Sequence, residues 1–345
     1  MSLDPALLEP SLLLGFVPVL LFLAGLLFMD SYKLVRRHEV LLSLCGGALA
    51  AILSLLVNVA LVTWGGVDPS VLRRYVAPFV EEALKAAIVI HLIRAEKVGF
   101  MVDAGIHGFA LGTGFALVEN FYYALLLGPG DPLVWLVRGL GTAVMHGSVT
   151  AIIGFLSKDL TDRHGSRSLR WFLPGFAIAY VVHSAYNHLL LNPLYSTAIL
   201  LAVMPMLLLL VFTRSEKATR DWLGSGLDSD VELLEEILSG QVVHSRVGEY
   251  LNSLRERFAG PVVADMLCLL QIHVELSLRA KGMLIARAAG VELEVDDEIR
   301  ANFEEMRYLE KSIGEVGMLA IMPLRRASSR DLWQLTMLEK GGRAT

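Results

Sequence analysis

The stretch YVAPFVEEALKAAIVIHLI places two adjacent glutamates and a lysine inside an apolar run that is long enough to cross a membrane. Glu81 is four residues and Glu82 three residues before Lys85, so on a helix the ammonium can pair with either carboxylate. A charged side chain at the centre of a membrane helix costs at least about 2.5–3.5 kcal/mol. We therefore take this stretch as the first candidate for a functional site.

Three later apolar runs also carry polar side chains, mostly one helical turn apart. These side chains are Glu119 and Asn120 in FALVEN, Arg138, Thr142 and His146 in RGLGTAVMH, and His183 and Asn187 in HSAYN. Residues four apart lie on one face of a helix. Four successive helices are thus expected to contribute to one polar site.

A glutamate and two histidines from separate helices are suited to a hydrolytic metal site. Three protein ligands hold Zn²⁺ and leave a position for water, whose pKa falls towards about 7. A second carboxylate can take the proton of this water during attack on a carbonyl. We assign Glu119, His146 and His183 to the metal, and Glu81 and Glu82 to catalysis. The sequence leaves open which glutamate is the base and which is a ligand.

The same residues also support chemistry without a metal. Two neighbouring carboxyl groups at a site of low dielectric constant have separated pKa values, so one can act as acid and the other as base. In either scheme Asn187 is assigned to catalysis, because its amide could donate a hydrogen bond to the developing oxyanion. Supporting roles are assigned to Lys85, Asn120, Arg138 and Thr142. Lys85 and Arg138 are expected to be charge partners of the carboxylates.

The composition is that of an integral membrane protein. Of the 345 residues 54% are hydrophobic, and the mean hydropathy is +0.56. Seven apolar stretches approach the length of about 20 residues that spans a bilayer. They are 11–29, 40–63, 75–95, 104–127, 133–157, 171–190 and 195–213. We predict an all-α polytopic membrane helix bundle of about seven spans.

The charge balance changes near residue 220, which predicts two domains. Residues 1–220 have a net charge of +2 and residues 221–345 a net charge of −7. We predict a membrane domain over 1–220 and a cytoplasmic, soluble helical domain with a regulatory or partner-binding role over 221–345. Charged residues, among them Asp265, Glu275, Arg279 and Lys281, recur through the apolar run 261–290, so we predict a buried helix of this domain rather than an eighth span.

Basic residues are concentrated in alternate loops. Twelve lysines and arginines follow the first, third, fifth and seventh stretches, and two lie in the other loops. The positive-inside rule places the N-terminus outside and the C-terminal domain in the cytoplasm. At a rise of about 1.5 Å per residue, Glu81, Glu119 and His183 lie about 9–12 Å below the outer ends of their helices, and His146 about 20 Å. We expect one cavity in the outer half of the membrane.

Taken in order, these motifs resemble the PrsW family of intramembrane proteases, which is related to the CAAX-prenyl protease superfamily. FVEEALK matches the EExxK motif of the family and FALVEN its FxxxEN motif, and the resemblance covers about residues 75–190. It implies a prokaryotic membrane protease that cleaves a membrane-anchored protein from the extracytoplasmic side. It also implies a site of the double glutamate and the two histidines, with zinc as the cofactor. The domain over 221–345 is a departure from the family core.

We therefore expect an endopeptidase that hydrolyses a peptide bond of a membrane-associated protein. Its further partners would be the lipid bilayer and a cytosolic partner of the C-terminal domain, and no nucleic acid is expected because no basic tract is present. A proton- or ion-coupled secondary transporter is one alternative, although it predicts an inverted repeat and the sequence shows none. The other is a non-catalytic membrane scaffold, which would tolerate the loss of Glu82 or His183.

Overall fold

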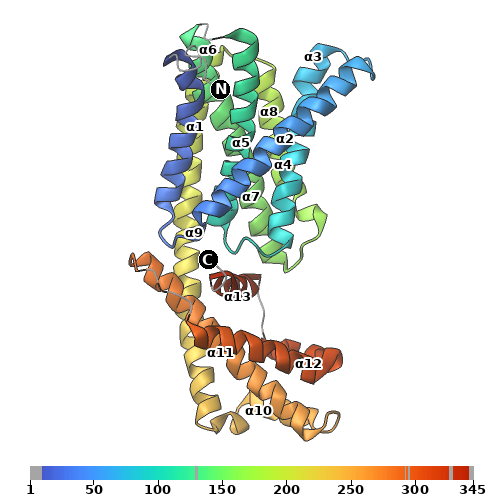
Figure 1. Ribbon diagram of the computed structural model, residues 1–345, viewed down its shortest axis with the longest axis vertical. Coiled ribbons are helices and arrows are strands. Elements are labelled where there is room, and N and C mark those ends of the chain that lie inside the picture. The colour runs from blue at the N-terminus through green and yellow to red at the C-terminus, as the bar shows by residue number, and fades with distance from the viewer. Residues whose placement is uncertain (1–9, 129–130, 292, 294–295, 326–328, 342–345) are drawn as a thin grey trace. The chain divides into compact units, whose positions relative to one another are not determined.

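The computed structural model describes residues 10–128, 131–291, 293, 296–325 and 329–341, and this part of the chain contains helices and no strands (Figure 1). The chain divides into two compact units, Met1–Glu216 and Lys217–Thr345. The division falls inside one long helix, α9 (Pro193–Leu238). The predicted all-α membrane bundle is confirmed.

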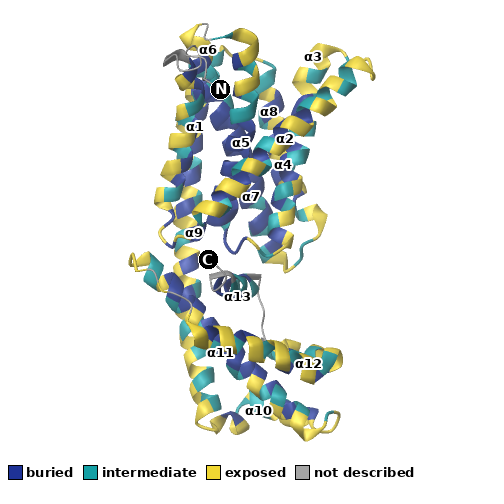
Figure 2. Ribbon diagram, viewed as in Figure 1, coloured by how far each residue is buried: buried dark blue, intermediate teal, exposed yellow. Residues whose placement is uncertain are grey.

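The first unit is a bundle of helices in which α5 is central. Its elements are α1 (Pro10–Met29), α2 (Arg37–Thr63), α3 (Pro69–Val71), the π-helix η2 (Leu72–Val76), α4 (Ala77–Arg94), α5 (Met101–Leu127), α6 (Pro132–Leu136), the π-helix η3 (Val137–Ala143), α7 (Val144–His164), the 3₁₀ turn η4 (Leu169–Trp171), α8 (Leu173–Asn187) and the first part of α9. Helix α5 packs most extensively against α7 and α2, and Figure 2 shows it buried over much of its length.

Small residues allow this close packing. A Cβ atom on Gly112 would lie 2.2 Å from the carbonyl oxygen of His146 on α7, and one on Gly114 would lie 2.0 Å from that of Leu44 on α2. Only glycine permits the backbones to approach so closely. The glycines in the stretch AGIHGFALGTG, residues 104–114, thus lie where α5 meets both neighbours.

Carboxylate caps set the starts of two helices that lead to the site. Asp103 accepts hydrogen bonds from the backbone amides of Gly99 and Phe100, each at 2.7 Å, at the beginning of α5. Asp68 caps α3 and accepts from the amide of Ser70 at 2.8 Å. Hydrogen bonds from the side chain and the backbone of Ser70 hold the pKa of Asp68 below its ordinary value.

Six helical segments within the described residues are long and apolar enough to cross a membrane: α1, α2, α5, the continuous segment Pro132–His164, α9 and α11 (Gly260–Ala288). The predicted spans 75–95 and 171–190 correspond to α4 and α8, which are not among them. Helix α4 carries four charged residues, and α8 has only 15 residues. The count of seven spans therefore stays a prediction.

The second unit comprises the remainder of α9, the 3₁₀ turn η5 (Gln241–His244), α10 (Arg246–Leu254), α11, α12 (Asp297–Arg325) and α13 (Ser329–Gly341). Helix α11 packs against α10, α12 and α13. Lys281 of α11 is 2% exposed and forms an ion pair with Asp230 of α9 at 2.5 Å. The amide of Gln334 on α13 donates to Ser277 at 2.8 Å. Lys281 and Ser277 of α11 thus find polar partners inside a helical unit.

Candidate functional site

The site lies where α4, α5, α7 and α8 approach one another at one end of the first unit. Its residues come from the beginnings of α4 and α7 and from the later parts of α5 and α8, as expected for successive antiparallel helices. A π-helical turn precedes both α4 and α7: η2 before the first and η3 before the second. Turns of this kind are rare and occur frequently at functional sites.

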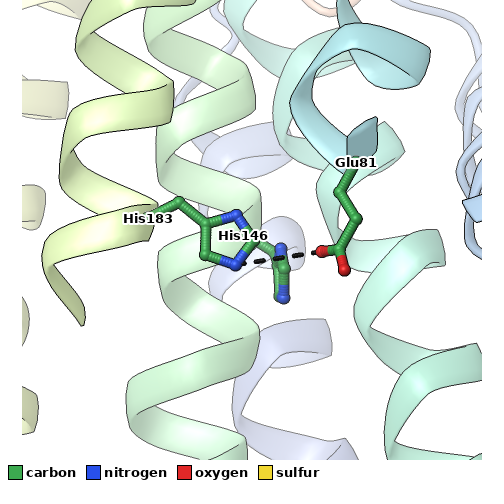
Figure 3. Close-up of side chains that lie close together, drawn as sticks. All are labelled: Glu81, His146 and His183. Carbon is green, nitrogen blue, oxygen red and sulfur yellow. Dashed lines mark ion pairs between the residues drawn. The ribbon is translucent and has the colours of Figure 1, made fainter. Parts of the chain in front are cut away.

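Three potential metal ligands converge from three helices (Figure 3). One ligand atom from each of Glu81, His146 and His183 lies within 4.8 Å of the others. The Nε2 atom of His183 is 3.8 Å from a carboxylate oxygen of Glu81. The two imidazole rings are nearly perpendicular, with centroids 4.8 Å apart. The structure therefore brings Glu81 into this group, where the sequence-based assignment had placed Glu119.

The orientation of His183 is set by Glu82. A carboxylate oxygen of Glu82 is 2.7 Å from Nδ1 of His183 and 2.6 Å from Nζ of Lys85, and the side chains of Glu82 and Lys85 are both fully buried. An ionised carboxylate only accepts hydrogen bonds, so Nδ1 of His183 carries the proton. The lone pair is then on Nε2, the nitrogen that faces Glu81.

His146 lies between a cation and an anion. Its Nδ1 atom is 3.1 Å from Nζ of Lys85, and its Nε2 atom is 3.1 Å from a carboxylate oxygen of Glu119. The ring of Phe115 covers this pair, with its centroid 4.9 Å from that of His146 and 4.7 Å from Nζ of Lys85. Glu119 is 26% exposed and His146 only 1%, so Glu119 is at the more accessible edge of the cluster.

Arg138 contacts both Glu119 and Asn120. Arg138 places Nη2 3.6 Å from Glu119 and donates through Nε to the side-chain oxygen of Asn120 at 2.9 Å. Asn120 in turn donates to the carbonyl of Gly15 on α1 at 2.6 Å. The guanidinium also lies 3.8 Å from the ring centroid of Tyr123. Sequence reasoning missed Tyr123, although its position four residues after Glu119 is a signal that could have shown it.

The structure does not bring Asn187 and Thr142 into this cluster. In the described part of the chain, the amide of Asn187 donates to the carbonyl of Arg73 in η2, at 3.1 Å. Thr142 is half-buried in η3. The expectation that Arg138, Thr142 and His146 share one face assumes α-helical geometry, whereas Thr142 lies in the π-helix η3, which turns less per residue.

A second feature that the sequence did not reveal is the attachment of α8 to η2. The hydroxyl of Ser184 donates to the carbonyl of Arg74 at 2.7 Å, beside the bond from Asn187 to Arg73. Because η2 leads directly into α4, these bonds connect the segment before Glu81 with the helix that carries His183.

The donor set suits a divalent metal ion. Two imidazole nitrogens and a carboxylate oxygen are ligands that zinc binds in catalytic sites with an open position. The contact from Glu82 to His183 is the carboxylate–histidine arrangement that usually orients a metal-binding imidazole. The other oxygen of Glu82 is buried and has no hydrogen-bond partner. The residues present are thus compatible with a metal.

Fold and site together define a polytopic α-helical membrane protein with a buried Glu/His/His group of the kind found in metallohydrolases. Residues 36–213, slightly more than half of the chain, match the model of the PrsW family of intramembrane metalloproteases. The chain belongs to this family and is an intramembrane protease. Comparison with curated proteins and with solved structures gave no match. The expected relationship to CAAX-prenyl proteases stays a hypothesis.

Proposed function

We propose that this protease holds a zinc ion with Glu81, His146 and His183 and cleaves a membrane-anchored protein substrate with a glutamate-activated water. The observation that carries the proposal is the convergence of three ligand atoms within 4.8 Å, one of them on an imidazole oriented by Glu82. The family match supports a divalent metal, and the donor chemistry favours zinc.

The residues around the Glu81, His146 and His183 group would have separate roles in catalysis. A bound zinc ion would supply Lewis acidity and a water molecule of lowered pKa. Glu119, at the accessible edge, is best placed to take a proton from the attacking water. Arg138 stabilises Glu119 as a carboxylate, and Lys85 offsets the charge of Glu82. The proposed roles of Glu81 and Glu119 are thus exchanged relative to the sequence-based assignment.

We further propose that cleavage occurs near the extracytoplasmic surface. Glu81 is five residues into α4, and His183 is four residues before the end of α8. The loop charges predict that these helix ends are outside. A substrate with a peptide bond at or just above the outer leaflet would then reach the site. A transporter is not favoured, because the family match points to proteolysis.

Metal content tests the proposal. We compare purified wild type with His146→Ala/His183→Ala and with a matched control, His91→Ala/His164→Ala, whose histidines are both exposed and outside the cluster. Zinc close to one ion per chain is expected in wild type and control, and its loss is expected in the site variant. Equal zinc in all three proteins, or a wild type that is active without metal, would contradict the proposal.

A further inference from the structure

Arg138 carries a buried hydrogen-bond donor that the described part of the chain does not use. Its side chain is 13% exposed, and among the described residues its Nη2 atom has no hydrogen-bond partner. Buried donors of this kind are rare in proteins, since leaving one unsatisfied costs about 1–3 kcal/mol. An unused donor on a charged group beside a candidate active site is therefore expected to serve a ligand.

The position of this donor is set by contacts on two sides of the guanidinium. Nε of Arg138 donates to the side-chain oxygen of Asn120 at 2.9 Å, and Asn120 is itself fixed to the carbonyl of Gly15 on α1 at 2.6 Å. The guanidinium carbon lies 3.8 Å from the ring centroid of Tyr123, which packs against the buried Trp135. The guanidinium is thus held in place before a substrate arrives, as a preorganised donor needs to be.

The donor lies beside the accessible edge of the cluster. Nη2 of Arg138 is 3.6 Å from Oε2 of Glu119, and the same oxygen is 3.1 Å from Nε2 of His146. The first distance is too long for a direct hydrogen bond, so this ion pair leaves the N–H groups of Nη2 available. Asn187, the donor that the sequence suggested for an oxyanion, instead binds the carbonyl of Arg73. Arg138 is therefore better placed for this role than Asn187.

We propose that Arg138 is a catalytic residue that binds the carbonyl oxygen of the scissile peptide bond through Nη2. The inference rests on the proposed function, because it takes Glu119 as the base that activates the water. When the water oxygen bonds to the carbonyl carbon, its proton passes to Glu119 and an electron pair of the C=O double bond moves to the oxygen. The negative charge thus leaves Glu119 and appears on the oxyanion, and the guanidinium of Arg138 can pair with each in turn.

The second half of the reaction restores the first arrangement. The oxyanion re-forms the C=O double bond, the C–N bond breaks, and the proton held by Glu119 goes to the leaving nitrogen. Glu119 is then again a carboxylate beside Arg138. Arg138 gives up no proton in either step, because a guanidinium stays charged in proteins.

Binding of a tetrahedral analogue tests this role in the full-length protein. The bond cleaved in a transmembrane reporter peptide is mapped by mass spectrometry and is then replaced by a phosphonamidate, in which a phosphoryl oxygen takes the place of the oxyanion. Arg138→Lys keeps the positive charge but lacks the planar set of donors. We expect it to retain zinc and the KM of the reporter, and to lower kcat and phosphonamidate affinity each by about 10²–10³-fold, as loss of one oxyanion donor does. Arg163→Lys, at an arginine that is 71% exposed and pairs with Asp159, is the control and should match wild type.

A second variant separates contact with the substrate from support of Glu119. In Glu119→Gln/Arg138→Gln both charges of the pair are removed, so neither is left buried without its partner. This protein should bind the phosphonamidate more weakly than Glu119→Gln does, again by about 10²–10³-fold. Equal affinity of these two variants would overturn the inference, because Arg138 would then act only through Glu119. A wild type that lacks zinc and binds the phosphonamidate no better than the reporter would contradict the proposed function as well.

Discussion

At the scale of single residues, the buried charges of this protein are arranged as a chain of partners. Glu82 contacts both Lys85 and His183, and Lys85 also contacts His146. Removing one member of a buried ion pair typically costs about 3–5 kcal/mol, because the other charge is left without compensation. The cost of burying EEALK is thus offset by a network that also orients both histidines.

The sequence-based and the structure-based assignments exchange the roles of Glu81 and Glu119. Metal binding can distinguish between these two assignments. Glu81→Gln should lose the metal, because the amide is a weaker ligand than the carboxylate at the convergent group. Glu119→Gln should keep the metal and lower the cleavage rate by about 10²–10⁴-fold, the usual contribution of a general base. Zinc content and the turnover of a transmembrane reporter substrate are measured on both variants.

Glu96→Gln is the matched control for these variants. Glu96 pairs with Arg167 at 2.7 Å, away from the cluster, so its loss should change neither metal content nor turnover. If Glu119→Gln lost the metal and Glu81→Gln retained it, the roles would be those assigned from the sequence.

At the scale of elements, the position of His146 depends on how closely α5 and α7 approach. A Cβ atom added at Gly112 would lie 2.2 Å from the carbonyl oxygen of His146 and 2.6 Å from Cα of Gly147. Any side chain at residue 112 must separate the two helices at the level of the site. Glu119, two turns further along α5, would move with its helix.

A matched pair of glycine substitutions tests this dependence. Gly112→Ala is expected to cost about 1–3 kcal/mol of stability by overpacking and to lower both zinc retention and activity. Gly25→Ala on α1, where a Cβ atom meets nothing within 4 Å, should be neutral or stabilise by up to about 1 kcal/mol. Thermal unfolding in detergent and metal content are measured for both. Equal behaviour of the two variants would show that this close approach does not position the site.

The helix content and the membrane helices on either side of the site could be predicted because apolar runs and helical spacing are local properties of the sequence. Asn187 and Thr142 were assigned on α-helical spacing. Thr142 lies in the π-helix η3, where this spacing does not hold, and Asn187, at the end of α8, donates to the carbonyl of Arg73 in η2 instead. Glu81 and Glu119 could not be separated, because their distances from the histidines depend on the rotation of α4 and α5 about their axes. Such rotations are set by packing between helices, such as the glycine contacts of α5, rather than by composition.

At the scale of the whole molecule, the side on which cleavage occurs depends on topology. Twelve basic residues against two in alternate loops predict that the loop containing Ser70 is outside and the loop containing Ser168 is cytoplasmic. Both serines are exposed, and they lie beyond opposite ends of the helices that carry the site. Ser70 is close to the end of α4 where Glu81 lies, so its location also decides which face of the membrane the site approaches.

Labelling of single cysteines with a membrane-impermeant maleimide measures this topology. In a background with Cys45 and Cys268 replaced by alanine, Ser70→Cys should react in intact cells, and Ser168→Cys only after permeabilisation. The reason is the loop charge bias, since lysines and arginines are retained on the cytoplasmic side during insertion. The reverse pattern would place the site near the cytoplasmic surface. The substrate bond would then have to lie at the inner leaflet. This result would contradict the proposal of extracytoplasmic cleavage and would leave the proposed metal site unaffected.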